Sequence, residues 1–111
     1  MSKKLLKTIT EALDDKKGRD IKVIDVRKKC SFADDMVIVT GTSSRHVKSL
    51  ATEASMESKK RGLIPLGVEG MDAGEWVLVD LGDIIVHVMQ PKIREFYQLE
   101  KLWSVEAEAE A

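Results

Sequence analysis

The stretch LGVEGMDAGEWVLVDLGDIIVHVMQP, residues 66–91, decides the fold of this 111-residue chain. Its second half contains two runs of strand length, EWVLVDL and IIVHVM, which are joined at Gly82-Asp83. β-Branched residues are frequent in both runs, and a connecting pair that begins with glycine favours a tight two-residue turn. The sequence therefore predicts a β-hairpin at this place.

The predicted hairpin has two unlike faces, because successive side chains in a strand point to opposite sides. If Leu81 faces Ile84 across the turn, one face is wholly aliphatic, and we expect it to lie on the core. Its other members are Val77, Val79, Val86 and Val88. The second face carries Trp76, Leu78, Asp80, Ile85, His87 and Met89. This mixed face is too polar for a core and too apolar for an idle surface, so we interpret it as a partner-binding surface.

Acidic residues are concentrated around the hairpin. Residues 66–91 contain no lysine or arginine, and their acids are Glu69, Asp72, Glu75, Asp80 and Asp83. A basic protein surface would be steered towards such a region. The alternative is that these acids only keep loops and an edge strand soluble.

Composition restricts the class of protein. A hydrophobic content of 43% and a charged content of 33% suit one globular domain. The net charge of −1 argues against a protein that holds nucleic acid mainly through phosphates. A single cysteine, Cys30, excludes an intrachain disulfide. No run has the length of a signal peptide or a membrane span, so we expect a cytoplasmic protein without membrane contact.

The remaining elements surround the hairpin in a simple order. Apolar spacing predicts a helix over residues 3–17, strands over 21–26 and 36–40, a helix from the Thr42–Ser44 caps to Gly62, a short peripheral strand over 63–69, and a last helix after Pro91. In the last helix we expect Ile93, Phe96, Tyr97, Leu99 or Glu100, and Trp103 to face the core. The prediction is an α/β (α+β) fold with a mixed sheet of about five strands. Its helices lie mainly on one face, so part of the other face remains open. We expect one domain over residues 1–104 and a flexible acidic tail over 105–111.

Several residues that suggest chemistry have simpler readings. The Gly41-Thr42-Ser43-Ser44 junction lacks the lysine of a phosphate-binding P-loop, and helix capping explains it. Arg45 and His46, in the first turn after it, suit an anionic partner or simply an exposed helix start. His46 and His87 have no zinc-site spacing, and nothing beside Cys30 marks a nucleophile. Asp34, Asp35 and Asp80 do not form the Asp-x-Asp pair that nucleotidyltransferases place shortly after a Gly-Ser element. We therefore expect no catalytic residue, metal or cofactor.

The chain resembles the bacterial ribosomal silencing factor family, also called Iojap-like, over about residues 5–104. The motifs that carry the resemblance are DIKVIDV, TGTSSRHV, PLGVEG, EWVLVDLGDIIVHVMQP and REFYQLEKLW, all in the expected order. Cys30 and Asp35 stand where the family pattern has serine and an aromatic residue, which leaves the local packing there open. The resemblance implies a fold related to nucleotidyltransferases but without their catalytic carboxylates.

The resemblance also implies a partner and a mechanism. The partner is ribosomal protein fourteen of the large ribosomal subunit, and binding blocks joining of the small subunit and so represses translation. On this basis we expect Trp76 to anchor the contact, with Leu78, His87 and Met89 around it. The acids Glu69, Glu75, Asp80 and Asp83 would add charge complementarity. The competing readings are that Trp76 packs under the loop at residues 70–75 or in a homodimer, and that the protein is a nucleotide-binding or nucleotidyltransferase-like enzyme.

Overall fold

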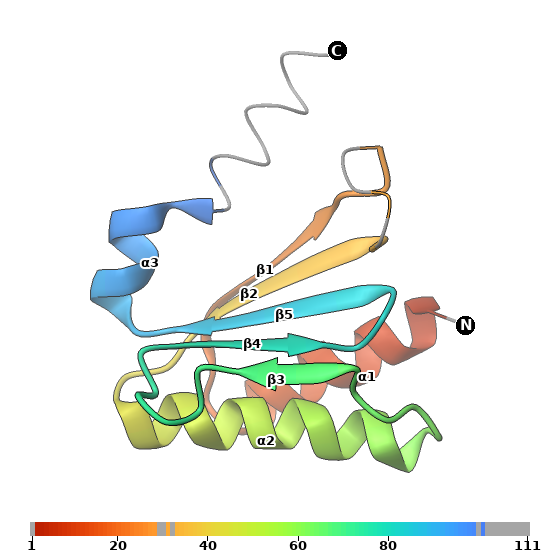
Figure 1. Cartoon of the computed structure of the whole chain (residues 1–111), viewed down its shortest axis with the longest axis horizontal. Coiled ribbons are helices and arrows are strands. Elements are labelled where there is room, and N and C mark those ends of the chain that lie inside the picture. The colour runs from red at the N-terminus through yellow and green to blue at the C-terminus, as the bar shows by residue number, and fades with distance from the viewer. Residues whose placement is uncertain (1, 29–30, 32, 100, 102–111) are drawn as a thin grey trace.

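A five-stranded mixed sheet is the centre of the computed structural model, which describes residues 2–28, 31, 33–99 and 101 (Figure 1). The elements are α1 (Ser2–Asp15), β1 (Arg19–Asp25), β2 (Asp35–Thr40), α2 (Ser44–Lys60), β3 (Gly67–Glu69), β4 (Trp76–Asp80), β5 (Ile84–Met89) and α3 (Pro91–Tyr97). The strand order is β1-β2-β5-β4-β3, with β2 and β5 parallel and the other pairs antiparallel. The predicted element order and fold class are confirmed. Cys30, Glu100, Trp103 and the tail at 105–111 lie outside the described residues.

The β4–β5 hairpin has the predicted register. Val77 pairs with Val88 and Val79 pairs with Val86, and the N–H of Leu81 donates to the carbonyl of Ile84 at 2.9 Å. Gly82 begins the turn with a φ of +89°, a backbone conformation that costs glycine little. The turn at Gly82-Asp83, from which the hairpin was predicted, therefore closes it.

The aliphatic face of the hairpin is the main core. It packs with α1 and α2, which lie together below the sheet in Figure 1. Ile9 and Leu13 of α1 and Val47, Leu50 and Ala54 of α2 are fully buried there. Ser43 caps α2, since its Oγ accepts from the backbone N–H of His46 at 3.1 Å. Both long helices thus cover one face of the sheet.

Helix α3 lies on the opposite face, above the sheet in Figure 1, so two of the three helices share one face, in agreement with the prediction that the helices lie mainly on one face. Gln90-Pro91 turns the chain directly after β5, and Ile93 then packs against a second cluster of buried residues. That cluster consists of Val26, Ala33, Met36, Ile38, Ile85 and Met89. The mixed face of the hairpin is therefore covered at its β5 side and less covered towards β3.

The side of α3 that faces the sheet also differs from the prediction. Phe96 is 78% exposed and Tyr97 is 50% exposed, so the expectation that both face the core is wrong. Arg94 is buried instead, and its Nη1 donates to Thr40 Oγ1 at 2.8 Å. The helix ends at Tyr97 because Gln98 takes a left-handed conformation with a φ of +47°. A short helix with a buried arginine does not show the apolar spacing that sequence analysis relies on.

Candidate functional site

Burial divides the mixed face into a covered part and an open part. Met89 is fully buried, and Ile85 and His87 are 6% exposed. Trp76, Leu78 and Asp80 of β4 are only half-buried. Glu69 of β3 is exposed and pairs directly with Leu78, so it lies on the same face. We call Glu69, Trp76, Leu78 and Asp80 the open patch.

Trp76 is held in the open patch by contacts from two other elements. Its Nε1 donates a hydrogen bond to His87 Nδ1 at 3.0 Å, and the two ring centroids lie 5.9 Å apart. The ring of Tyr97, from α3, lies against the indole with a centroid distance of 4.8 Å and an interplanar angle of 48°. The position of the indole is therefore fixed before any partner arrives.

His87 supports Trp76 from within. Burial lowers the pKa of His87 to about 4, so the imidazole is neutral near pH 7 and Nδ1 can accept a hydrogen bond from the indole N–H. The side chain lies behind the surface that a partner would meet. Within the described residues, no three His, Cys, Asp or Glu side chains are grouped so that they could hold a metal ion.

The loop between β3 and β4 holds the backbone of Trp76, the first β4 residue of the open patch, in place. Gly70 has a φ of +93°, and a Cβ at this position would overlap the carbonyl oxygen of Trp76. Gln90 ties the same loop to the start of α3, because its side-chain Nε2 donates to the Gly74 carbonyl and its backbone N–H donates to the Glu75 carbonyl, each at 2.9 Å. Glu75 is exposed directly before Trp76 and therefore borders the patch.

The predicted acids do not all gather at this site. Glu69 and Glu75 lie at or beside the open patch, and Asp80 lies within it, where its Oδ1 accepts from the N–H of Gly82 at 2.9 Å. Asp83 lies in the hairpin turn, beyond the other end of β4 from Trp76. Its backbone carbonyl accepts from the N–H groups of Asp34 and Asp35. Asp83 therefore lies at the opposite end of β4 from Trp76, close to Asp80 along the chain.

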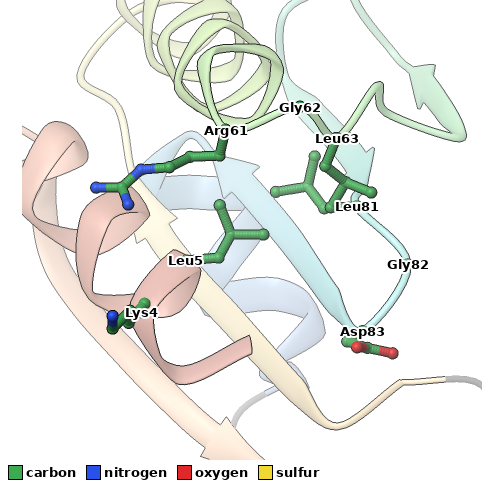
Figure 2. Close-up of a pocket in the computed structure, with 8 residues that line it drawn as sticks. All are labelled: Lys4, Leu5, Arg61, Gly62, Leu63, Leu81, Gly82 and Asp83. Carbon is green, nitrogen blue, oxygen red and sulfur yellow. The ribbon is translucent and has the colours of Figure 1, made fainter. Parts of the chain in front are cut away.

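Asp83 borders a cavity of about 530 Å³ between α1, the end of α2 and the hairpin turn. Figure 2 shows Leu5, Leu63 and Leu81 between the cations Lys4 and Arg61 on one side and Asp83 on the other. Arg61 donates to Thr8 Oγ1 at 2.8 Å, which links α2 to α1 across the cavity rim. Among the described residues that line this cavity, Asp83 carries the one carboxylate.

The junction before α2 is a structural cap. The N–H of Thr42 donates to His46 Nδ1, and His46 Nε2 lies 2.9 Å from the carbonyl oxygen of Lys16. Because Nδ1 accepts, Nε2 carries the proton and donates to Lys16. Both ring nitrogens of His46 are therefore engaged within the chain, which supports the capping reading over a contact of His46 with an anionic partner.

The contact of Tyr97 with Trp76 was not predicted from the sequence. The periodicity of the last helix assigned Tyr97 to the core, whereas the structure places it half-exposed against Trp76. Phe96 continues this aromatic cluster outward, with its ring 4.9 Å from that of Tyr97. The sequence did contain one indication. Phe96 and Tyr97 are adjacent, and two adjacent residues of a helix do not share one face, so both could not point to the core.

The chain is similar to known proteins in family, sequence and structure. The family model described as "Ribosomal silencing factor during starvation" matches residues 1–111. The ribosomal silencing factor RsfS of Haemophilus influenzae is 50% identical over 100 residues, which cover 90% of this chain and 98% of that protein. A crystal structure of a protein from Chromobacterium violaceum superposes with a TM-score of 0.90 at 44% identity, covering 92% of this chain and 85% of the other.

A more distant relative carries a different name. The mouse protein named "Mitochondrial assembly of ribosomal large subunit protein 1" is 36% identical over 100 residues, which cover 87% of this chain and 44% of that protein.

The described part of the chain has no helix with the length and apolar character needed to cross a membrane.

Proposed function

The chain belongs to the ribosomal silencing factor family, and from this premise we propose that it represses translation by docking on the large ribosomal subunit. The contact is made with ribosomal protein fourteen of that subunit, through the open patch. The bound protein then occupies space that the small subunit needs when the two subunits join. The action is steric and makes or breaks no covalent bond.

The open patch carries this proposal. It combines a half-buried tryptophan and leucine with the carboxylates of Glu69 and Asp80, and Glu75 borders it. Large apolar side chains surrounded by polar groups are typical of the centre of a protein interface. The acids complement a basic partner, and no lysine or arginine from residues 66–91 opposes them.

The size of the molecule supports a steric mechanism. Its principal extents are 38 × 33 × 22 Å, and the open patch occupies the β3–β4 side of one sheet face. When that patch is bound, the main core with α1 and α2 lies on the far face of the sheet and projects away from the contact (Figure 1). A body of this size, bound on the surface that the small subunit contacts, would keep the two subunits apart.

Sucrose-gradient sedimentation with purified subunits tests the proposal. We expect the protein to sediment with large subunits but not with small ones, and to reduce the amount of assembled particle when added before the subunits are mixed. Sedimentation with neither subunit, or an unchanged amount of assembled particle, would refute the proposal. If the open patch instead mediates dimerisation, the protein will sediment as a dimer alone and bind no subunit.

A further inference from the structure

The hydrogen bond between Trp76 and His87 determines what the open patch offers to a partner. An indole has a single donor, Nε1–H, and no acceptor. That donor is directed inward to His87 Nδ1 at 3.0 Å, in a side chain that is 6% exposed. The hydrogen-bonding capacity of Trp76 is therefore used within the protein.

The surroundings of Trp76 define the rest of the platform. The ring centroids of Tyr97 and Trp76 lie 4.8 Å apart. The indole of Trp76 is therefore contacted by His87 from β5 and by Tyr97 from α3. Leu78 lies two residues further along β4 on the same face and pairs with Glu69. Asp80 follows on that face after another two residues. An apolar strip thus leads from the ring to two carboxylates.

We propose that His87 is a positioning residue that accepts the indole N–H of Trp76 and fixes the ring as an apolar platform, which with Glu69 and Asp80 selects a lysine or arginine side chain of the partner. This inference rests on the proposed function of the open patch. The methylene stem of the bound side chain lies along Trp76 and Leu78, and its cationic head reaches the carboxylates. A partner group that needs a hydrogen-bond donor from Trp76, such as a backbone carbonyl, finds none.

The hydrogen bond is tested first in the free protein. His87→Leu removes the acceptor at similar volume, whereas His87→Asn keeps an acceptor near the position of Nδ1. We expect the ¹H–¹⁵N signal of the Trp76 indole to move upfield and to exchange faster with water in His87→Leu, and to stay close to its original position in His87→Asn. Trp103→Phe assigns the signal, since the chain has two tryptophans. An identical indole signal in all three proteins would overturn the proposal.

A double-mutant cycle then separates positioning from packing, with purified ribosomal protein fourteen as the probe. His87→Leu should weaken binding about five-fold, in the range of coupling between residues in contact. Trp76→Phe keeps a ring but has no N–H for His87 to hold. In that background His87→Leu should have no further effect. If His87→Leu weakens binding equally in both backgrounds, or in neither, His87 has no positioning role.

The dependence of binding affinity on ionic strength tests whether the open patch selects a cationic side chain of the partner. Binding of the unaltered protein should weaken as ionic strength rises, and the combined variant Glu69→Gln with Asp80→Asn should show a flatter dependence. An unchanged dependence would overturn the assignment of these two acids. If the unaltered protein does not bind ribosomal protein fourteen at all, the proposed function fails and the selection of a cation fails with it. If it binds but the cycle shows no coupling, the function stands and only the role of His87 is lost.

Discussion

At the level of single residues, the register of the strands decides which side chains of the site meet. Trp76 and His87 are an example. The two residues lie diagonally across β4 and β5, because Trp76 pairs with Met89 and Leu78 pairs with His87. Diagonal neighbours on one face are within reach of aromatic side chains, and here they form a hydrogen bond of 3.0 Å. Sequence alternation alone placed both residues on the mixed face.

Alternation does not predict which of these residues remain open to a partner. Met89 packs in one cluster with Met36 and Ile38, from a strand about fifty residues earlier, and with Ile93 of α3. His87 pairs with Ile38 on that same earlier strand. Such contacts join distant segments, and no local pattern in the sequence encodes them. The predicted contact set therefore separates into a half-buried Trp76 and Leu78 at the surface and a supporting layer beneath them.

The buried imidazole predicts a specific pH dependence of stability. The pKa of His87 is about 4 in the folded state, against 6.5 for an unperturbed histidine. Between these values the unfolded chain binds a proton that the folded chain does not, so the free energy of unfolding should fall as pH decreases from about 6.5 to about 4. The loss is on the order of 3 kcal/mol at the acid end.

Urea denaturation at several pH values measures this effect. His87→Asn, which does not titrate, is the matched control, because it differs from the unaltered protein in this one side chain. The difference between the two stability curves should slope only in that pH window. Parallel curves from pH 7 to pH 4 would show that His87 is not buried as a neutral group.

At the scale of elements, the connection between β3 and β4 sets the geometry of the open patch. It carries Glu69 at the end of one strand and Trp76 at the start of the next, and Gln90 holds it against α3. The sequence predicted a loop at residues 70–75. It did not reveal that Gly70 packs directly against the Trp76 backbone.

Replacement of Gly70 should therefore destabilise the protein strongly. Gly70→Ala combines a positive φ with an overlap between the new Cβ and the Trp76 carbonyl oxygen, and we expect a loss of about 2–4 kcal/mol in the free energy of unfolding. Gly67→Ala is the control, since a Cβ there meets nothing within 4 Å. It should change stability by less than about 0.5 kcal/mol. Equal effects of the two substitutions in urea denaturation would contradict this account of the loop.

The order of elements was predictable, whereas the placement of α3 was not. The long helices and the strands β1, β2, β4 and β5 were found near their predicted places, and the predicted strand over 63–69 is shortened to Gly67–Glu69. In α3 the buried residue is Arg94, whose long side chain reaches Thr40 on β2. A contact of this kind defines the position of a helix without leaving an apolar pattern in its sequence.

At the scale of the whole molecule, the acids of residues 66–91 fall into two places. Glu69, Glu75 and Asp80 accompany the open patch, and Asp83 stands at the cavity near Lys4 and Arg61 (Figure 2). The sequence treats these acids as one acidic region, because proximity in the chain is all that it shows. The structure shows the difference, because Asp83 lines the cavity beside α1 and the end of α2, whereas Asp80 shares a sheet face with Trp76.

Charge reversal at the two places should have different effects on binding. Glu69→Lys puts a cation into the open patch, where a basic partner would be repelled, and we expect binding to large subunits to weaken by about ten-fold. Asp83→Lys makes the same change in charge at the far end of β4 and should weaken binding by about two-fold or less, because only long-range charge is altered. Co-sedimentation at one ionic strength compares the two. Equal loss would show that net charge, not the patch, decides binding.

The most direct test of the central claim is the affinity of Trp76→Ala for purified large subunits, measured beside Ile64→Ala. Ile64 is 74% exposed and lies outside the open patch, in the connection between α2 and β3, so it controls for the loss of a large surface side chain. We predict that Trp76→Ala, with its fold verified by circular dichroism, loses about 2 kcal/mol or more of binding free energy and no longer blocks subunit joining. Ile64→Ala should bind as the unaltered protein does. A folded Trp76→Ala protein that binds and blocks as well as Ile64→Ala would contradict the account.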